Sequence, residues 1–137
     1  MNKIILDTNC YVAYLAGNKK VLLSLSVAKI VFMSIFVLGE LYAGFKGGTR
    51  EKENVNMLRT FLNKPSVHIL NASIETAELF GMVKNTLKKS GFPIPINDVW
   101  IAAHALEHGA VLVTRDRHFS HLPGLRLWES GLLETGV

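Results

Sequence analysis

Short apolar runs alternate along the chain with longer segments whose apolar residues recur at helical spacing. The runs lack polar alternation, which is typical of strands buried on both faces of a parallel sheet. They predict strands at residues 3–6, 30–33, 67–70 and 110–113, and a last strand at 125–128. The segments between them predict helices at about 8–16, 19–28, 35–46, 51–63, 73–90 and 98–108. Strands alternating with helices indicate an α/β domain in which helices flank a mainly parallel sheet of four to five strands.

The segment from Ile74 to Leu87 has the clearest helical pattern. Its apolar residues recur at Ile74, Ala77, Phe80, Val83 and Leu87. We expect this stripe to face the protein interior, because an amphipathic helix buries its apolar face.

Composition favours one domain spanning residues 1–137. The chain is 49% hydrophobic and only 19% charged, so it can bury one substantial core. Its single cysteine, Cys10, rules out an internal disulfide and is expected to be a small buried residue. An acidic residue as early as Asp7 argues against a signal peptide, and no apolar stretch reaches the roughly 20 residues of a membrane-spanning helix. We therefore expect a cytoplasmic protein without membrane contact.

The first candidate site residues are the aspartates, and the sequence has three of them: Asp7, Asp98 and Asp116. Asp7 follows the first predicted strand, Asp116 follows the strand at 110–113, and Asp98 begins an apolar helix. If the two strands are parallel neighbours, Asp7 and Asp116 share one edge of the sheet. The helix from Asp98 has to return the chain to the start of the strand at 110, so Asp98 joins them. Open α/β proteins bind their ligands at this carboxyl edge.

Each acidic residue also has a simpler structural interpretation. Asp7 could cap a helix, Asp98 could cap the next helix at a position that the helix dipole favours for a carboxylate, and Asp116 could stabilise a turn. Glu40 lies off the main apolar stripe of its predicted helix and could be a solvated surface residue. Taken together, three aspartates at strand ends or helix starts, in a chain that has no others, favour a shared site. Carboxylates that gather this way repel one another unless a cation neutralises them, and oxygen ligands prefer Mg²⁺, with Mn²⁺ as a close substitute.

The order and spacing of these motifs resemble PIN-domain ribonucleases of the VapC toxin type. The resemblance rests on Leu6-Asp7-Thr8-Asn9, Gly39-Glu40-Leu41, the segment from Ile96 to Ala103, and Leu112-Val113-Thr114-Arg115-Asp116 followed by Phe119. It covers nearly the whole chain, and its most specific part is the Asn-Asp-x-x-Ile-Ala-Ala segment placed before Thr-Arg-Asp. It implies a three-layer PIN-like nuclease domain.

The same resemblance implies roles for individual residues and partners. Asp7, Glu40, Asp98 and Asp116 would line a catalytic metal site, with Thr8, Asn9 and Thr114 as a supporting polar shell. The implied activity is endoribonuclease cleavage by a metal-activated water, which leaves a 5′-phosphate and a 3′-hydroxyl. The implied partners are an RNA substrate, a small VapB-like antitoxin and a second copy in a homodimer.

Basic residues near these motifs are candidate RNA contacts. A net charge of +4 indicates a polyanionic partner only weakly. The candidates are Arg115, Arg117, Lys46 and Arg50.

Three other functions fit parts of the sequence. His104, Glu107 and His108 match H-x-x-E-H, an inverted zinc-peptidase pattern, although no third ligand is evident. A phosphoaspartate hydrolase would need an acid two positions after Asp7, where the chain has Asn9. A catalytically silent RNA-binding or antitoxin-binding module could also use the same fold. His118 and His121 are expected to be exposed loop residues.

Overall fold

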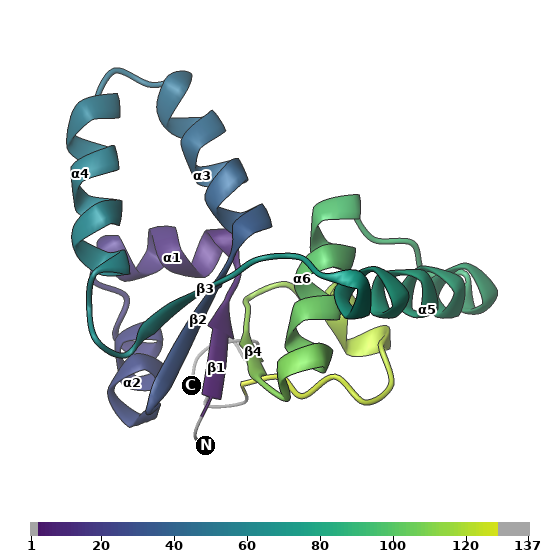
Figure 1. The fold of residues 1–137 in the computed structure, drawn as a ribbon. Helices are drawn as coiled ribbons and strands as arrows, with labels where there is room; N and C mark the ends of the chain where they lie inside the picture. The colour runs from purple at the N-terminus through teal and green to yellow at the C-terminus, as the bar shows by residue number, and fades with distance from the viewer. Residues whose placement is uncertain (1–2, 129–137) are drawn as a thin grey trace.

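A four-stranded parallel sheet forms the centre of the computed structural model, which describes residues 3–128 (Figure 1). Its strands pair in the order β3-β2-β1-β4, and every pairing is parallel. The bounds are Lys3–Leu6 for β1, Ile30–Ser34 for β2, Val67–Leu70 for β3 and Val111–Val113 for β4. The four predicted strands are therefore confirmed to within one residue.

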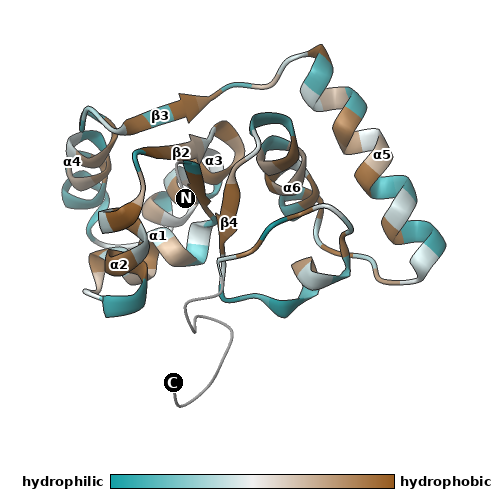
Figure 2. Ribbon diagram, turned by 90° about the horizontal axis from the view of Figure 1, so that it is seen from below, coloured by the Kyte–Doolittle hydropathy of each residue, from teal (hydrophilic) through white to brown (hydrophobic). Residues whose placement is uncertain are grey.

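Within residues 3–128 six α-helices flank this sheet, and the predicted α/β three-layer class is confirmed. They are α1 (Thr8–Leu15), α2 (Lys19–Val27), α3 (Ile35–Lys46), α4 (Glu51–Leu62), α5 (Ile74–Ser90) and α6 (Ile96–His108). Right-handed crossovers place α1 to α4 on one face and α5 and α6 on the other. Figure 2 shows α1, α2 and α4 on one side of the sheet and α5 and α6 on the other. No helix in the described part of the chain is both long enough and apolar enough to cross a membrane.

Strand β1 lies between β2 and β4 at the middle of the core. Ile4, Ile5 and Leu6 are all fully buried, which explains why its sequence shows no polar alternation. Cys10, just inside α1, is also fully buried, as expected.

The last predicted strand, 125–128, is not a regular strand. Leu127 forms a single parallel bridge with Leu112, which donates its N–H to the carbonyl of Arg126 and accepts one from Trp128. The segment comes directly after the turn at Pro123 and Gly124, where Gly124 has φ of 81°. Contact with one residue of β4 is too short for a strand ladder.

The apolar stripe predicted for α5 is wrong at its first turn. Ile74 is 75% exposed, whereas Thr76, Val83 and Leu87 are buried. Thr76 turns inward because it forms a capping box with Ser73 and donates its hydroxyl to Glu107 of α6. The polar cap therefore sets the rotation of the first turn.

Candidate functional site

The carboxyl ends of β1 and β4 meet at one edge of the sheet. Leu6 pairs with Val113, so Asp7 and Thr114 follow side by side. The N–H of Asp7 continues the ladder by donating to the carbonyl of Val113 at 3.3 Å. The prediction that Asp7 lies beside the segment leading to Asp116 is therefore confirmed.

Asp7 is only 5% exposed and is held at both carboxylate oxygens. Oδ1 accepts the backbone N–H of Cys10 at 2.8 Å, which caps α1. Oδ2 accepts the hydroxyl of Thr114. The capping interpretation is thus correct, but it accounts for only one of the two oxygens.

Glu40 projects from α3 toward the start of α1. Its Oε1 accepts the hydroxyl of Thr8 at 2.7 Å, and its side chain is half-buried. The interpretation as a solvated surface residue is wrong, because the Glu40 carboxylate is partly buried and hydrogen-bonded to another helix. Thr8 therefore joins Glu40 to the helix that Asp7 caps.

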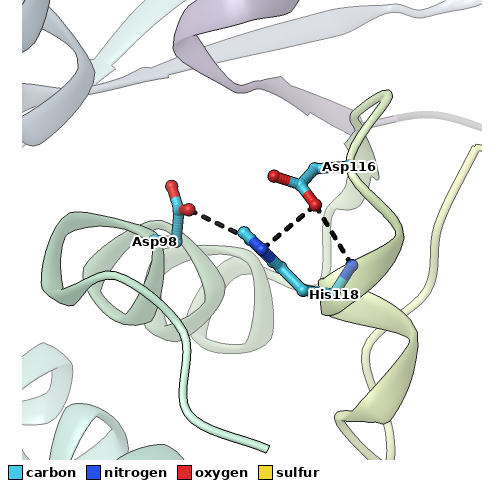
Figure 3. Close-up of side chains that lie close together, drawn as sticks. All are labelled: Asp98, Asp116 and His118. Atoms are coloured by element: carbon cyan, nitrogen blue, oxygen red, sulfur yellow. Dashed lines mark hydrogen bonds and ion pairs between the residues drawn. The ribbon is translucent and has the colours of Figure 1, made fainter.

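Asp98 lies in the first turn of α6 and does not cap it. The helix begins at Ile96, two residues earlier than predicted, with Pro95 as its N-cap and no side-chain cap bond. The carboxylate thus benefits from the positive end of the helix dipole while its oxygens face the site. Its Oδ2 lies 3.0 Å from Nε2 of His118 (Figure 3).

Asp116 and Thr114 are linked through the backbone after β4. The Thr114 hydroxyl accepts the N–H of Asp116 at 3.0 Å while donating to Asp7. Asp116 Oδ1 accepts the N–H of His118 at 3.2 Å and thereby caps the short 3₁₀ helix η1 (Arg117–His121). The turn interpretation of Asp116 is therefore correct for this oxygen.

His118 is a site residue that the sequence analysis missed. We expected it to be an exposed loop residue, but it lies between two acids, with Nδ1 3.0 Å from Asp116 Oδ1 and Nε2 3.0 Å from Asp98 Oδ2 (Figure 3). The available signal was its position two residues after an acid at the carboxyl edge. His121, at the end of the same 3₁₀ helix, is exposed as expected and stacks on Phe92.

The electrostatics show that the four acids share one region. Burial raises the pKa of Asp98, the neighbouring His118 opposes that rise, and repulsion from Glu40, Asp7 and Asp116 adds to it. Burial also raises the pKa of Asp7, against the hydrogen bonds that Asp7 accepts from Thr114 and Cys10. The carboxylates therefore gather at a cost, which a cation would relieve.

A cleft of about 490 Å³ opens beside Asp116. Asn9, Arg115 and Arg117 line it together with small and apolar residues of α1. Asn9 is exposed there, so it faces the cleft and not the buried side of Asp7. The cleft offers two cations and an amide next to the acidic cluster.

The other two predicted RNA contacts are engaged elsewhere. Lys46 pairs with Glu51 at 3.0 Å and Arg50 pairs with Glu53 at 2.8 Å, all on the exposed surface at the junction of α3 and α4. They lie apart from the residues that line the cleft.

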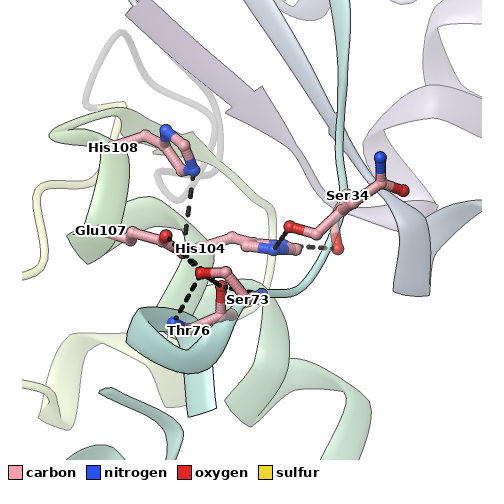
Figure 4. Close-up of polar contacts among 7 residues, drawn as sticks. Ser34, Ser73, Thr76, His104, Glu107 and His108 are labelled. Carbon is pink, nitrogen blue, oxygen red and sulfur yellow. Dashed lines mark hydrogen bonds and ion pairs between the residues drawn. The ribbon is translucent and has the colours of Figure 1, made fainter. Parts of the chain in front are cut away.

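The H-x-x-E-H segment does not form a zinc site (Figure 4). His104 is fully buried, with Nδ1 2.9 Å from the Ser34 hydroxyl and Nε2 3.2 Å from the carbonyl of Asn71. Glu107 accepts hydrogen bonds from Ser73 and Thr76. Both ring nitrogens and the carboxylate are therefore occupied by structural contacts, which contradicts the peptidase alternative.

The donor atoms at the carboxyl edge suit a hard divalent cation. In residues 3–128, Asp98, Asp116 and His118 each offer one atom, and these three atoms lie within 4.8 Å of one another. Carboxylate oxygens favour Mg²⁺ and Mn²⁺, and one imidazole shifts the preference toward first-row transition metals. The residues present therefore fit the implied ion.

Comparisons with known proteins agree with this geometry. The family model of the PIN domain matches residues 4–125. Ribonuclease VapC1 of Haemophilus influenzae strain R2866 is 31% identical over 130 residues, covering 90% of this chain and 94% of the relative. The tRNA(fMet)-specific endonuclease VapC of Salmonella typhimurium is 26% identical over 131 residues, covering 93% and 97%. A crystal structure of VapBC2 from Rickettsia felis, bound to a DNA fragment from their promoter, superposes with a TM-score of 0.81 at 27% identity, covering 92% and 97%.

Proposed function

The chain belongs to the PIN-domain family, and on that premise we propose that it is a VapC-type endoribonuclease whose activity depends on Mg²⁺ or Mn²⁺. The observation that carries the proposal is the gathering of Asp7, Glu40, Asp98 and Asp116, from four separate stretches of chain, at one carboxyl edge. The similarity to ribonucleases supports RNA cleavage as the reaction. The four acids support metal dependence, because a cation would neutralise their mutual repulsion.

The chain's own residues prepare the site for phosphodiester hydrolysis. Thr114 and the Cys10 amide hold Asp7 in one orientation, and Thr8 does the same for Glu40. Arg115 and Arg117, in the adjacent cleft, are placed to contact RNA phosphates. A bound divalent cation would lower the pKa of a water and stabilise charge on the attacked phosphate. Hydrolysis by water would leave a 5′-phosphate and a 3′-hydroxyl.

The proposed partner is a VapB-like antitoxin, since the similar Rickettsia felis structure is a toxin–antitoxin complex. This assigns the chain the toxin role in a toxin–antitoxin pair that acts in the cytoplasm. A homodimer remains a prediction. A reading frame next to the gene, whose product co-purifies with this chain and inhibits its cleavage of RNA, would support the toxin role, whereas failure to inhibit would argue for a nuclease without that regulation.

The experiment that tests the activity compares metal dependence with acid dependence. Purified chain, free of antitoxin, is incubated with transfer RNA in Mg²⁺, Mn²⁺ or EDTA, and the cut ends are mapped. We expect cleavage with either metal, none in EDTA, and a loss of at least about 100-fold in Asp7→Asn and Asp98→Asn. Glu78→Gln, which changes an exposed acid on α5, is the matched control and should cleave like the wild type.

Two outcomes would overturn the proposal. Equal cleavage in EDTA and Mg²⁺ would remove the metal requirement. Stable binding of RNA or antitoxin without cleavage in any metal, by a chain with all four acids intact, would favour the catalytically silent module.

A further inference from the structure

The position of His118 carries an inference that rests on the proposed metal-dependent function and refines it. We propose that His118 binds the divalent cation directly through Nε2, and that Asp116 orients its ring. The site would then be a mixed nitrogen and oxygen site and not the all-carboxylate site that the sequence suggests. Three features of the geometry support this assignment.

The first feature is the unsatisfied nitrogen. His118 Nε2 is buried and has no hydrogen-bond partner in the described residues, although Asp98 Oδ2 lies only 3.0 Å away. The contact is therefore close but poorly aligned for an N–H donor. Two neighbouring ligands of one metal ion have this geometry: their atoms lie close together but are not aligned for a hydrogen bond, because each points at the ion.

The second feature is the separation itself. Two adjacent ligands of an octahedral ion, each at about 2.1 Å from it, lie about 3.0 Å apart. The Nε2 to Oδ2 distance of 3.0 Å agrees with that spacing. Asp98 and His118 therefore already have the spacing of a pair of metal ligands.

The third feature is the support behind the ring. Nδ1 of His118 lies 3.0 Å from Asp116 Oδ1, which also accepts the backbone N–H of His118 at 3.2 Å. Metal-binding histidines commonly place their second nitrogen against a carboxylate in this way, which fixes the ring and makes the ligand more basic. Asp116 is held in turn, because its own N–H donates to Thr114.

A nitrogen ligand has a consequence for metal choice. Mg²⁺ strongly prefers oxygen, whereas Mn²⁺ accepts imidazole and binds nitrogen-containing sites more tightly. His118 should therefore make the site selective for Mn²⁺ over Mg²⁺, independently of which RNA is cleaved.

The direct test is electron spin-echo envelope modulation on the full chain loaded with one equivalent of Mn²⁺. We expect ¹⁴N modulation from a coordinated imidazole in the wild type and its loss in His118→Gln. His121→Gln, which changes an exposed histidine three residues away, is the matched control and should keep the signal. Asp116→Asn should also keep it, while binding Mn²⁺ about 10–100-fold more weakly.

Binding constants provide a second readout that needs no RNA. Mn²⁺ titrations, followed by the electron paramagnetic resonance signal of the free ion, should show at least about tenfold weaker Mn²⁺ binding in His118→Gln than in the wild type. The loss of Mg²⁺ affinity, measured by competition with Mn²⁺, should be smaller. Circular dichroism and thermal unfolding in EDTA would establish that each variant is folded.

The outcomes separate this inference from the proposed function. Mn²⁺ that binds the wild type without ¹⁴N modulation, or binds His118→Gln equally or more tightly, would show that His118 is only an ion-pair partner of the acids, and the nuclease would stand. Absence of any Mn²⁺ binding to the wild type, together with cleavage in EDTA, would instead overturn the metal-dependent function itself.

Discussion

Replacing Thr114 by valine removes one hydroxyl and almost no volume from the base of the site. Thr114 is 1% exposed, and its oxygen both donates to Asp7 and accepts the N–H of Asp116. Valine keeps the branched shape, so no cavity forms, but a buried carboxylate oxygen and an amide each lose a partner. The variant should therefore lose stability through hydrogen bonding alone.

The magnitude follows from those two contacts. A hydrogen bond to a charged group contributes about 1.5–3 kcal/mol and a neutral one about 0.5–1.5 kcal/mol. We therefore expect Thr114→Val to lower the free energy of unfolding by roughly 2–4 kcal/mol at pH 7 in EDTA. Added Mg²⁺ should recover part of the loss, because a cation near Asp7 replaces some of the missing stabilisation of its charge.

Urea unfolding followed by circular dichroism measures this difference. Thr60→Val is the matched control, because Thr60 is exposed on α4 and its hydroxyl bonds only to the carbonyl of Asn56. It should change stability by less than about 0.5 kcal/mol. A Thr114→Val variant as stable as that control would refute the idea that Asp7 depends on this hydroxyl.

Three further predictions address the acids, the long helix and the cysteine. Burial raises the pKa of Asp98 in the folded chain above its ordinary value of 3.8, so ionisation of Asp98 destabilises the fold as the pH rises from 3.8 through the folded-state pKa. In EDTA, Asp98→Asn should therefore match the wild type in stability below about pH 3.8 and be the more stable protein toward neutral pH. A difference in unfolding free energy that stays the same from pH 3 to 7 would contradict this. Phe80→Ala should lower the free energy of unfolding in urea by about 1–3 kcal/mol, because the half-buried Phe80 ring stacks on Trp100 with their ring centroids 4.0 Å apart. Ile74→Ala should lower it by less than about 0.5 kcal/mol, because Ile74 is exposed. Equal losses would mean that the first turn of α5 packs against the interior as its sequence suggested. Burial raises the pKa of the Cys10 thiol, so Ellman's reagent should label the folded chain at pH 8 far more slowly than the urea-unfolded chain, and rapid labelling in native buffer would show that Cys10 is accessible.

The sequence was sufficient to predict the sheet and the helices, because the patterns of apolar residues that indicate them are local and unambiguous. Runs such as Ile4 to Leu6 are apolar at every position, and a strand buried on both faces has this pattern. Proximity of Asp7 and Asp116 followed from one further step, the assumption that their strands are parallel neighbours, and β1 does pair with β4.

The errors arose where tertiary contacts override local pattern. Ile74 continues an apolar period, but Thr76 sets the turn because its hydroxyl reaches Glu107, 31 residues away in sequence. Leu127 has the composition of a strand residue but meets only Leu112 of β4. Neither contact is encoded in a short window of sequence.

His118 was missed for a different reason. Its partners are Asp98, on another element, and Asp116, at a separation of two residues that a helix does not place on one face. A loop histidine that follows two arginines, Arg115 and Arg117, would ordinarily be solvated, whereas the short 3₁₀ helix directs His118 toward the edge of the sheet. Sequence spacing could identify the acids but not the side chain between them.

One buried hydrogen bond connects the two helices that carry Glu40 and Asp98. Ser34 ends β2 and caps α3 by accepting the N–H of Phe36, and its oxygen also lies 2.9 Å from Nδ1 of His104 on α6. Burial lowers the pKa of His104, so its ring stays neutral and can serve as a structural hydrogen-bonding group. The segment that suggested a zinc peptidase therefore contributes to the proposed site, because the His104 contact holds α6 against the start of α3, and these two helices carry two of the acids that would share a cation.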